Sequence, residues 1–203
     1  MRRSFGKIIT ELADRDEKIY VVVGDIGYSV FDEYREKHPN RFINMGICEQ
    51  SMIGVSAGMA LEGLKPWVYT ITPFLIERPF EQVKLDIDQQ NVNVKLVGYS
   101  DYPTLGPTHT ELNGKMQMRL FKNIVSYFPK DGEETIQFVN EAYDKVVWVG
   151  DAGYKSKTDP GKVDYPEDDD DDEKKDEKFD VVTLGGNKGD KSKTCLLYTS
   201  DAA

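Results

Sequence analysis

The hydrophobic residues near the start of the chain change from a helical spacing to a strand spacing. Between Ser4 and Leu12, apolar residues recur at intervals of three and four, which is the period of one helix face. From Ile19 to Val23 the apolar run is continuous and rich in β-branched residues, as in a strand that is buried on both faces. The chain therefore opens with a predicted helix followed by a predicted buried strand.

The same alternation of strands and helices continues as far as Val149. The later predicted strands are Phe42–Asn44, Pro66–Thr70, Val94–Gly98, Asn123–Tyr127 and Val146–Val149. The later predicted helices are Glu49–Leu61, Phe74–Gln89 and Glu133–Tyr143. Strands that alternate with helices at this spacing pair in parallel through right-handed crossovers, with helices on both faces. We therefore predict a doubly wound α/β domain with a mainly parallel sheet over residues 1–150.

The pattern ends after Gly150. Residues 151–178 contain a run of five aspartates and almost no apolar residue to pack, so we expect an acidic disordered linker. Residues 179–194 begin with one strand-like apolar cluster, which cannot fold alone, and we interpret them as the truncated start of a C-terminal domain. Residues 195–203 resemble the translation of a sequencing adapter and are expected to be non-native; a natural unstructured tail is the alternative.

Much of the net charge of −10 lies outside the predicted domain. Residues 151–203 contain 15 acidic and 9 basic side chains, a net of −6, which leaves −4 for residues 1–150. Neither part has the basic stripe that binds a phosphate backbone, so we expect no nucleic-acid partner. No run of about 18 apolar residues and no export signal occurs, so we expect a soluble, cytoplasmic protein that does not bind a membrane.

The two cysteines, Cys48 and Cys195, lie far apart in the sequence. Neither belongs to a Cys-x-x-Cys or Cys/His cluster. We therefore expect neither a disulfide framework nor a zinc site, and we predict no metal ligands on this chain.

Ligands of doubly wound sheets bind outside the carboxyl ends of the strands, and the loops at those ends hold the unusual residues of this chain. One such loop leads into a helix that Glu49 opens and that continues in Gly, Ser, Ala and apolar residues. Small residues let neighbouring backbones approach closely, so this helix is suited to burial. Taken alone, Glu49 has an ordinary explanation, because the helix dipole stabilises a carboxylate in the first turn by roughly 0.3 to 1 kcal/mol.

The stretch Arg41–Gly58 closely resembles the transketolase superfamily, whose pattern is approximately Arg-Phe-x-Asn-x-Gly-Ile-x-Glu-Gln-x-Met-x-Gly-x-Ala-x-Gly. In that family the glutamate binds the aminopyrimidine ring of thiamine diphosphate and shifts it to the imino tautomer. The imino nitrogen then removes the proton from the thiazolium carbon. The resemblance implies that Glu49 activates this cofactor, in a dry site where its hydrogen bond to the ring is strong. The apolar neighbours Ile47, Met52 and Ile53 fit that requirement.

The resemblance covers roughly Arg2 to Val149 and implies roles for residues in other loops. Arg2 lies in an Arg-x-x-Phe-Gly stretch whose arginine can reach the substrate phosphate. The loop after the first strand places Asp25 near the cofactor and Ser29 near the phosphate. For Asp25, simple turn chemistry between two glycines is the alternative.

Two phenylalanines resemble the aromatic residues that stack on the pyrimidine ring in this family. Phe74 lies at the entry of the predicted helix and is the better match. Phe80 is the second candidate, with the alternative that it is a core residue, because phenylalanine at helical spacing usually is.

The two histidines are expected to have different roles. The sequence Gly106-Pro107-Thr108-His109 resembles the family's Gly-Pro-Thr-His, so His109 is expected beside the reactive carbon of the cofactor, contacting substrate and transferring protons. His38 lies in a charged stretch and is expected to be a solvated surface residue.

Two positions depart from the family pattern. Many transketolases have an acidic residue four positions before this histidine, where the chain has Leu105. Another substrate histidine would fall near Ser100, where none exists. A donor other than the usual sugar phosphates, or an unphosphorylated one, therefore stays open.

The chain lacks the second half of the cofactor site. In the family, a Gly-Asp-Gly motif with a later asparagine binds Mg²⁺ and the diphosphate, and no stretch of this chain matches it. We therefore expect the Mg²⁺ ligands on a diphosphate-binding transketolase subunit, with the active site at the interface and a dimer of heterodimers as the assembly. A truncated longer chain is the alternative to a split enzyme.

These inferences predict the pyrimidine-binding subunit or fragment of a thiamine-diphosphate-dependent, transketolase-like enzyme. Such an enzyme transfers two-carbon ketol units between sugars or sugar phosphates. Alternatives within the superfamily are a deoxyxylulose-phosphate synthase and the β subunit of a 2-oxoacid dehydrogenase. A non-catalytic α/β partner subunit is the alternative from another class.

Overall fold

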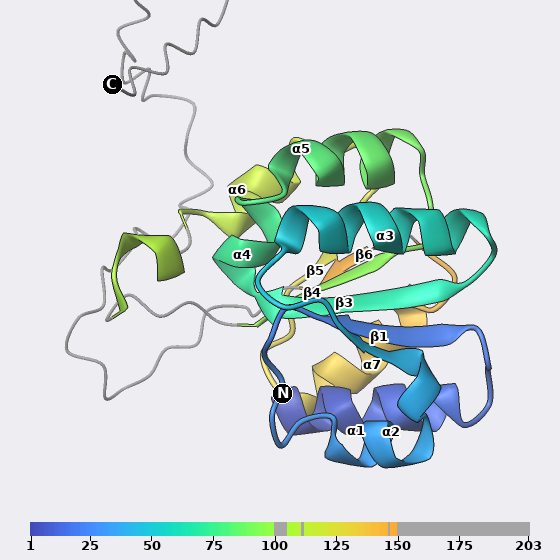
Figure 1. The fold of residues 1–203 in the computed structure, drawn as a ribbon. Helices are drawn as coiled ribbons and strands as arrows, with labels where there is room; N and C mark the ends of the chain where they lie inside the picture. The colour runs from blue at the N-terminus through green and yellow to red at the C-terminus, as the bar shows by residue number, and fades with distance from the viewer. Residues whose placement is uncertain (100–104, 111, 146, 150–203) are drawn as a thin grey trace, which may run out of the picture. The chain divides into compact units, whose positions relative to one another are not determined.

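The computed structural model describes residues 1–99, 105–110, 112–145 and 147–149 (Figure 1). All of them belong to one compact unit, Met1–Lys162. None of the helices in these ranges is long and apolar enough to cross a membrane. The linker, the truncated domain and the tail expected over residues 151–203 lie outside the described residues, as does Ser100, so those expectations stay predictions.

Six strands of the described ranges form one sheet, and all of their pairings are parallel. They are β1 (Ile19–Val23), β2 (Phe42–Asn44), β3 (Lys65–Ile71), β4 (Lys95–Tyr99), β5 (Val125–Tyr127) and β6 (Val147–Val149). Their order in the sheet is β2-β1-β3-β4-β6-β5. The chain therefore leaves β1 toward one side of the sheet and β3 toward the other, which makes a switch point between these two strands.

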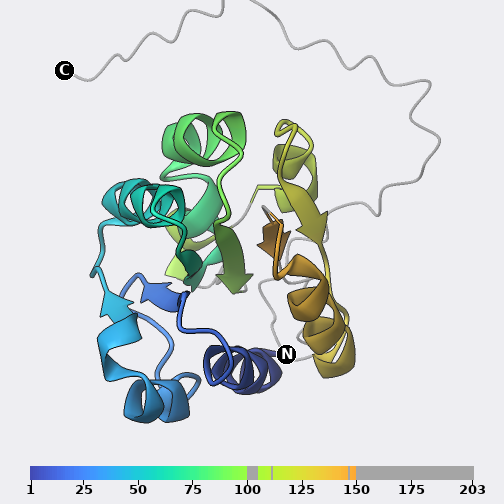
Figure 2. The same ribbon diagram turned by 90° about the vertical axis from the view of Figure 1, so that its right-hand side faces the viewer.

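Helices cover both faces of this sheet (Figures 1 and 2). One layer contains α1 (Arg2–Ala13), α2 (Asp32–Lys37) and α7 (Gly132–Ala142). The other layer contains α3 (Glu49–Leu61), α4 (Thr72–Ile76), α5 (Phe80–Gln82), the π-helical segment η2 (Val83–Gln89) and α6 (Gly114–Met118). The 3₁₀ turns η1 (Pro39–Arg41) and η4 (Pro107–His109) lie in connecting loops. The predicted doubly wound α/β architecture is confirmed.

Alternate residues of β1 face the two helix layers, so the sheet has an apolar core on each side. Val21 and Val23 belong to the cluster beneath α1 and α7, whereas Val22 belongs to the cluster beneath α3. Full burial stabilises the fold by roughly 1.5 to 3 kcal/mol for a side chain of this kind. Coverage on both faces is the reason that β1 shows an uninterrupted apolar run in the sequence.

The observed elements differ from the predicted ones mainly around Pro79. The predicted strands agree with the observed strands to within two residues at each end, and the predicted helix Glu49–Leu61 has the observed bounds. The prediction of one helix over Phe74–Gln89 is wrong, because the segment is divided into α4, α5 and η2. Proline lacks an amide hydrogen and disfavours helical geometry in the residue before it. The chain therefore turns a corner at Arg78 and Pro79.

Two short helices have no counterpart among the predicted elements. They are α2, with six residues, and α6, with five. Segments of this length are too short to show a helical period in their apolar residues. Both are additions to the predicted fold rather than changes in its order.

The Arg-x-x-Phe-Gly stretch is explained in part by packing. A Cβ atom on Gly6 would lie 2.1 Å from the carbonyl oxygen of Val30, so only glycine allows α1 to approach the loop after β1. The ring of Phe5 packs against those of Phe31 and Tyr69, with centroids 5.8 and 5.9 Å away. Phe5 and Gly6 therefore hold α1 on the sheet.

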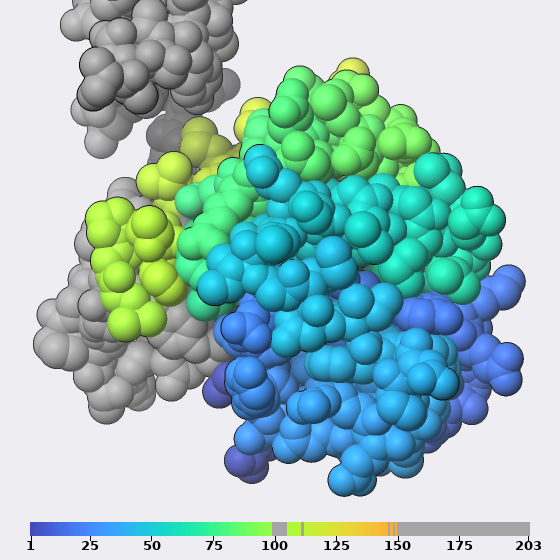
Figure 3. Space-filling view, viewed as in Figure 1, coloured from blue at the N-terminus to red at the C-terminus, as the bar shows by residue number. Residues whose placement is uncertain are grey.

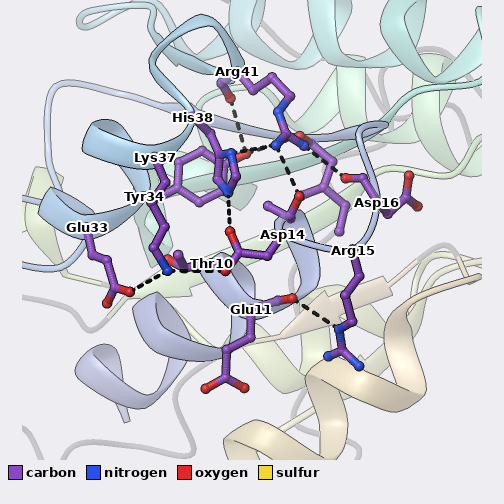
Figure 4. Close-up of polar contacts among 12 residues, drawn as sticks. Thr10, Glu11, Asp14, Arg15, Asp16, Glu33, Tyr34, Lys37, His38 and Arg41 are labelled. Atoms are coloured by element: carbon purple, nitrogen blue, oxygen red, sulfur yellow. Dashed lines mark hydrogen bonds and ion pairs between the residues drawn. The ribbon is translucent and has the colours of Figure 1, made fainter.

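A polar cluster at the amino edge of the sheet joins the end of α1 to the end of α2 (Figure 4). Arg41 donates hydrogen bonds to the carbonyl oxygens of Ala13 (3.0 Å) and Asp16 (2.9 Å), which lie at the end of α1 where helical partners are missing. The imidazole of His38 lies 2.6 Å from Nη2 of Arg41 and 2.8 Å from Oδ1 of Asp14. Only 11% of its side chain is exposed, so the prediction of a solvated His38 is wrong. Its partner Asp14 lies 24 residues earlier, beyond the reach of local sequence patterns.

Candidate active site

Asn44 fastens two loops to each other at the carboxyl edge of the sheet. Its Oδ1 accepts hydrogen bonds from the backbone amides of Asp25 (3.0 Å) and Gly46 (2.9 Å), and its Nδ2 donates to Oδ1 of Asp25 at 3.2 Å. The loop after β1 is thereby held against the loop that leads into α3. Sequence patterns alone do not single out Asn44, although an asparagine at the end of a strand, just before Gly46, is a usable signal for such a contact.

The loop after β1 has an unusual backbone conformation. Asp25 has φ of 53° and Ser29 has φ of 62°, in the left-handed region that non-glycine residues rarely adopt. Between them, Gly27 has φ of 101°, and a Cβ atom there would come within 2.7 Å of the ring of Phe31. Such strain costs about 1 to 3 kcal/mol per residue and persists only where the surroundings hold it. The result is that both Asp25 and Ser29 stay exposed at the carboxyl edge.

Glu49 is the first residue of α3, and only 5% of it is exposed. Its Oε1 accepts a hydrogen bond from Nη1 of Arg78 at 2.9 Å. A buried carboxylate needs such a partner, because an unpaired charge in the interior is costly. The helix dipole explains an acidic residue at this position but not the burial of its carboxyl group.

The ring of Phe74 lies beside this ion pair. The guanidinium carbon of Arg78 is 3.4 Å from the centroid of the Phe74 ring. The imidazole of His109 contacts the same ring edge-on, with centroids 4.8 Å apart and an interplanar angle of 66°. The structure thus connects Glu49, Phe74 and His109 through Arg78, a residue that the sequence patterns do not single out.

Arg2 and Phe80 are placed by other parts of the fold. Arg2 is the exposed first residue of α1, at the N-terminal label in Figure 1, and α1 lies in the opposite layer from α3. Because α1 runs antiparallel to β1, its start lies at the carboxyl edge. Phe80 is half-buried at the start of α5, and its ring packs against Phe121 with centroids 5.4 Å apart. That contact is the one expected of a core residue, so the cofactor role of Phe80 stays a prediction.

The arrangement fits an aminopyrimidine. A flat heteroaromatic ring can stack on Phe74 while one of its nitrogens faces the carboxyl group of Glu49. His109 is partly exposed on its loop, and its Nδ1 lies 3.0 Å from the hydroxyl of Thr108. Within the described ranges, no group of three or more His, Cys, Asp and Glu residues is placed to hold a metal ion. The chemistry available here is stacking, hydrogen bonding and proton transfer.

Comparison with known proteins adds curated relatives to this picture. One of the two kinds of chain that make up a split enzyme, the second subunit of the apulose-4-phosphate transketolase of Phocaeicola vulgatus, is 35% identical over 142 residues, which are 68% of this chain and 46% of that protein. The 1-deoxy-D-xylulose-5-phosphate synthase of Aquifex aeolicus is 36% identical over 138 residues, 64% of this chain and 21% of that protein. The chain thus spans less than half the length of these relatives.

A solved structure and a family model point the same way. A split-gene transketolase, described as an inactive beta4 tetramer, has a TM-score of 0.67 and 29% identity, covering 73% of this chain and 50% of the other. The family model of the transketolase pyrimidine-binding domain matches residues 1–148. That match spans the described sheet and both helix layers. The chain therefore belongs to the transketolase pyrimidine-binding domain family.

Proposed function

We propose that this chain supplies the pyrimidine-binding half of the active site in a thiamine-diphosphate-dependent enzyme. The assembled enzyme transfers two-carbon ketol units between sugars or sugar phosphates. The observation that carries the proposal is the buried carboxyl group of Glu49, connected to the ring of Phe74 through Arg78. The family match and the name of the P. vulgatus relative, a transketolase subunit, support it.

Glu49 and Phe74 hold the pyrimidine ring in this proposal. When bound, thiamine diphosphate supplies a nucleophilic carbon that adds to the carbonyl group of the ketose. Glu49 holds a proton on a carboxyl oxygen and shares it with a ring nitrogen, and its burial strengthens this hydrogen bond because water does not compete. Phe74 orients the ring by stacking. The buried Met52 and Ile53 keep the inner side of α3 dry.

His109 transfers protons at the substrate. The hydroxyl of Thr108 engages Nδ1, so Nε2 is the ring atom that exchanges a proton with a substrate oxygen. Asp25 contacts the cofactor from the loop after β1, while Ser29 and Arg2 bind the phosphate of the substrate. The exposure of all three side chains supports these roles, because a ligand can reach them.

The proposal includes a partner subunit that binds the diphosphate and carries the Mg²⁺ ligands. The outer side of α3 supports such a partner, because apolar and small residues occur all round this helix beyond its first turn. Helices of that kind are normally covered on all sides. Here Val55 and Leu61 are exposed, the space beside Gly58 is open, and Figure 3 shows α3 (teal) at the surface. A dimer of heterodimers would cover this surface.

A deoxyxylulose-phosphate synthase-like enzyme is the second candidate. The A. aeolicus synthase is similar over 138 residues, and the exposed Leu105 stands where many transketolases carry an acidic residue. Donor assays on the assembled enzyme separate the two candidates. Consumption of a ketose phosphate favours the transketolase reaction, and consumption of a 2-oxoacid favours the synthase-like reaction.

The substitution Glu49→Gln in the chain assembled with its partner tests the proposed function. Glutamine cannot exchange the proton, so turnover and the circular dichroism band of the imino form should both be lost. The matched control is Glu62→Gln, an exposed position just after the other end of α3, which should keep both signals. Survival of both signals in Glu49→Gln would refute the proposed role.

A further inference from the structure

Arg78 places a flat cation on the two groups that the proposed function assigns to the aminopyrimidine. Its Nη1 donates to Oε1 of Glu49 at 2.9 Å, and its guanidinium carbon lies 3.4 Å from the centroid of the Phe74 ring. A guanidinium is planar, stacks on aromatic faces and presents N–H donors in its own plane. An aminopyrimidine would be held by the same two features, a stacking face and an edge that faces the carboxyl group.

The two occupants cannot share one face of the Phe74 ring. At 3.4 Å the guanidinium is already in van der Waals contact with the ring, so no second ring fits between them. Phe74 as a whole is only 9% exposed, and the imidazole of His109 covers a further part of it. A pyrimidine can therefore stack here only if a covering group leaves.

Arg78 is the group best placed to leave. Its side chain is 36% exposed, whereas that of Glu49 is 6% exposed. It lies at the corner between α4 and α5, where Pro79 interrupts the helix. A long side chain at such a corner can turn into solvent without any change in the sheet or in α3.

We propose that Arg78 is an internal ligand of the pyrimidine site. Its guanidinium keeps Glu49 paired and Phe74 covered in the chain without cofactor, and the aminopyrimidine replaces it on binding. This inference rests on the proposed function, because it takes Glu49 and Phe74 as the cofactor contacts. The exchange gives the buried carboxyl group a hydrogen-bond partner both before and after binding, which avoids the penalty for an unpaired buried group.

An internal ligand lowers the apparent affinity for the cofactor. Only the fraction of molecules in which Arg78 has left can bind, and the apparent dissociation constant rises in proportion. Removal of Arg78 should therefore strengthen cofactor binding. An arginine that only supports Glu49 predicts the opposite sign, because its loss would leave the carboxyl group poorly held.

The test measures cofactor affinity in the full chain assembled with its diphosphate-binding partner. Thiamine diphosphate is titrated calorimetrically in the presence of Mg²⁺. The dissociation constant should fall about three- to tenfold in Arg78→Ala. It should fall less in Arg78→Lys, because lysine keeps the charge but cannot stack as a plane. The matched control is Lys84→Ala, an exposed cation in η2, which should leave the affinity unchanged.

Thermal unfolding of the same variants gives a second readout. Without cofactor, Arg78→Ala should melt below the wild type because Glu49 loses its partner, and saturating thiamine diphosphate should reduce that difference. Equal or weaker affinity in Arg78→Ala overturns the inference and leaves the proposed function intact. A wild-type assembly that binds no thiamine diphosphate overturns both. If Arg78→Ala does not fold, Arg78→Lys decides the sign.

Discussion

The two histidines of this chain lie at opposite edges of the sheet and have similar aromatic neighbours. The ring of His109 packs edge-on against Phe74, with centroids 4.8 Å apart and planes at 66°. The ring of His38 packs edge-on against Tyr34, with centroids 5.2 Å apart and planes at 68°. Aromatic packing alone therefore does not distinguish a catalytic histidine from a structural one.

The difference lies in the ring nitrogens. Both nitrogens of His38 are within hydrogen-bonding distance of a charged side chain, Arg41 on one side and Asp14 on the other. For His109, the described part of the chain provides one partner, the hydroxyl of Thr108 at Nδ1. A histidine with both nitrogens engaged holds elements together, whereas one with a nitrogen available can exchange a proton with a ligand.

The two edges differ in the same way beyond their histidines. At the amino edge, Lys65 lies 3.2 Å from Asp16 and 3.0 Å from Asp144, and its ammonium group lies 3.6 Å from the centroid of the Tyr143 ring. Charges there are paired among residues of the fold. At the carboxyl edge, Asp25 is exposed on a strained backbone. Paired charges indicate stability, and exposed polar groups on strained loops indicate function.

The largest expected effect comes from exchanging the two histidines for asparagine. His109→Asn should lower turnover of the assembled enzyme about 10²- to 10⁴-fold, because proton transfer is lost, and change the unfolding free energy by less than about 0.5 kcal/mol. His38→Asn should do the reverse and lower the unfolding free energy by about 1 to 2 kcal/mol with turnover retained. Steady-state kinetics and urea unfolding measure the two effects. Loss of turnover in His38→Asn would break the comparison.

Arg41→Ala should destabilise the chain by about 2 to 3 kcal/mol, because the carbonyl groups of Ala13 and Asp16 lose a charged donor. Urea unfolding measures this change. The control is Arg15→Ala, whose exposed hydrogen bond to the carbonyl of Glu11 should contribute less than about 1 kcal/mol. Arg41 belongs to the same family-like stretch as Glu49, so an unchanged cofactor affinity would separate its structural role from chemistry.

Gly6→Ala should destabilise the chain by about 1 to 3 kcal/mol, because the new Cβ atom meets the carbonyl oxygen of Val30. Gly58→Ala is the matched control, since a Cβ atom there meets nothing within 4 Å and alanine is the better helix former. Its unfolding free energy should stay level or rise by up to about 1 kcal/mol. Thermal and urea unfolding of the isolated chain would reveal equal effects if the close approach of α1 were unimportant.

Lys95 provides the smallest effect, and one that depends on pH. Burial, together with the nearby Lys65, lowers the pKa of Lys95 to about 7. The unfolded state, with a lysine pKa of about 10.4, binds more protons between these values, so stability should rise with pH across that range. Lys95→Met should raise the unfolding free energy by about 1 to 2 kcal/mol at pH 7, with a smaller gain near pH 10.

Urea unfolding at a series of pH values measures this gain. Lys84→Met, at an exposed position, is the control and should show no pH-dependent gain. A gain for Lys95→Met that is the same at pH 7 and pH 10 would contradict the assignment of a neutral lysine in the folded state.

The sequence by itself determined the order of the elements, the parallel sheet and the loops that carry the candidate residues. Apolar periodicity is a local property of residues a few positions apart, and it was sufficient to place the six strands and the helix Glu49–Leu61. The resemblance around Glu49 pointed to the family to which the chain belongs. Even the corner at Pro79 had a local signal, which the apolar spacing of Phe74–Gln89 obscured.

Only the tertiary structure decided which side chains meet. Arg78 reaches Glu49 across 29 residues, and His38 reaches Asp14 across 24. These partners come from elements that crossover connections bring to the same edge of the sheet, and no local pattern encodes such a contact. The residue that covers the candidate cofactor site and the histidine that holds α1 to α2 are therefore properties of the folded chain.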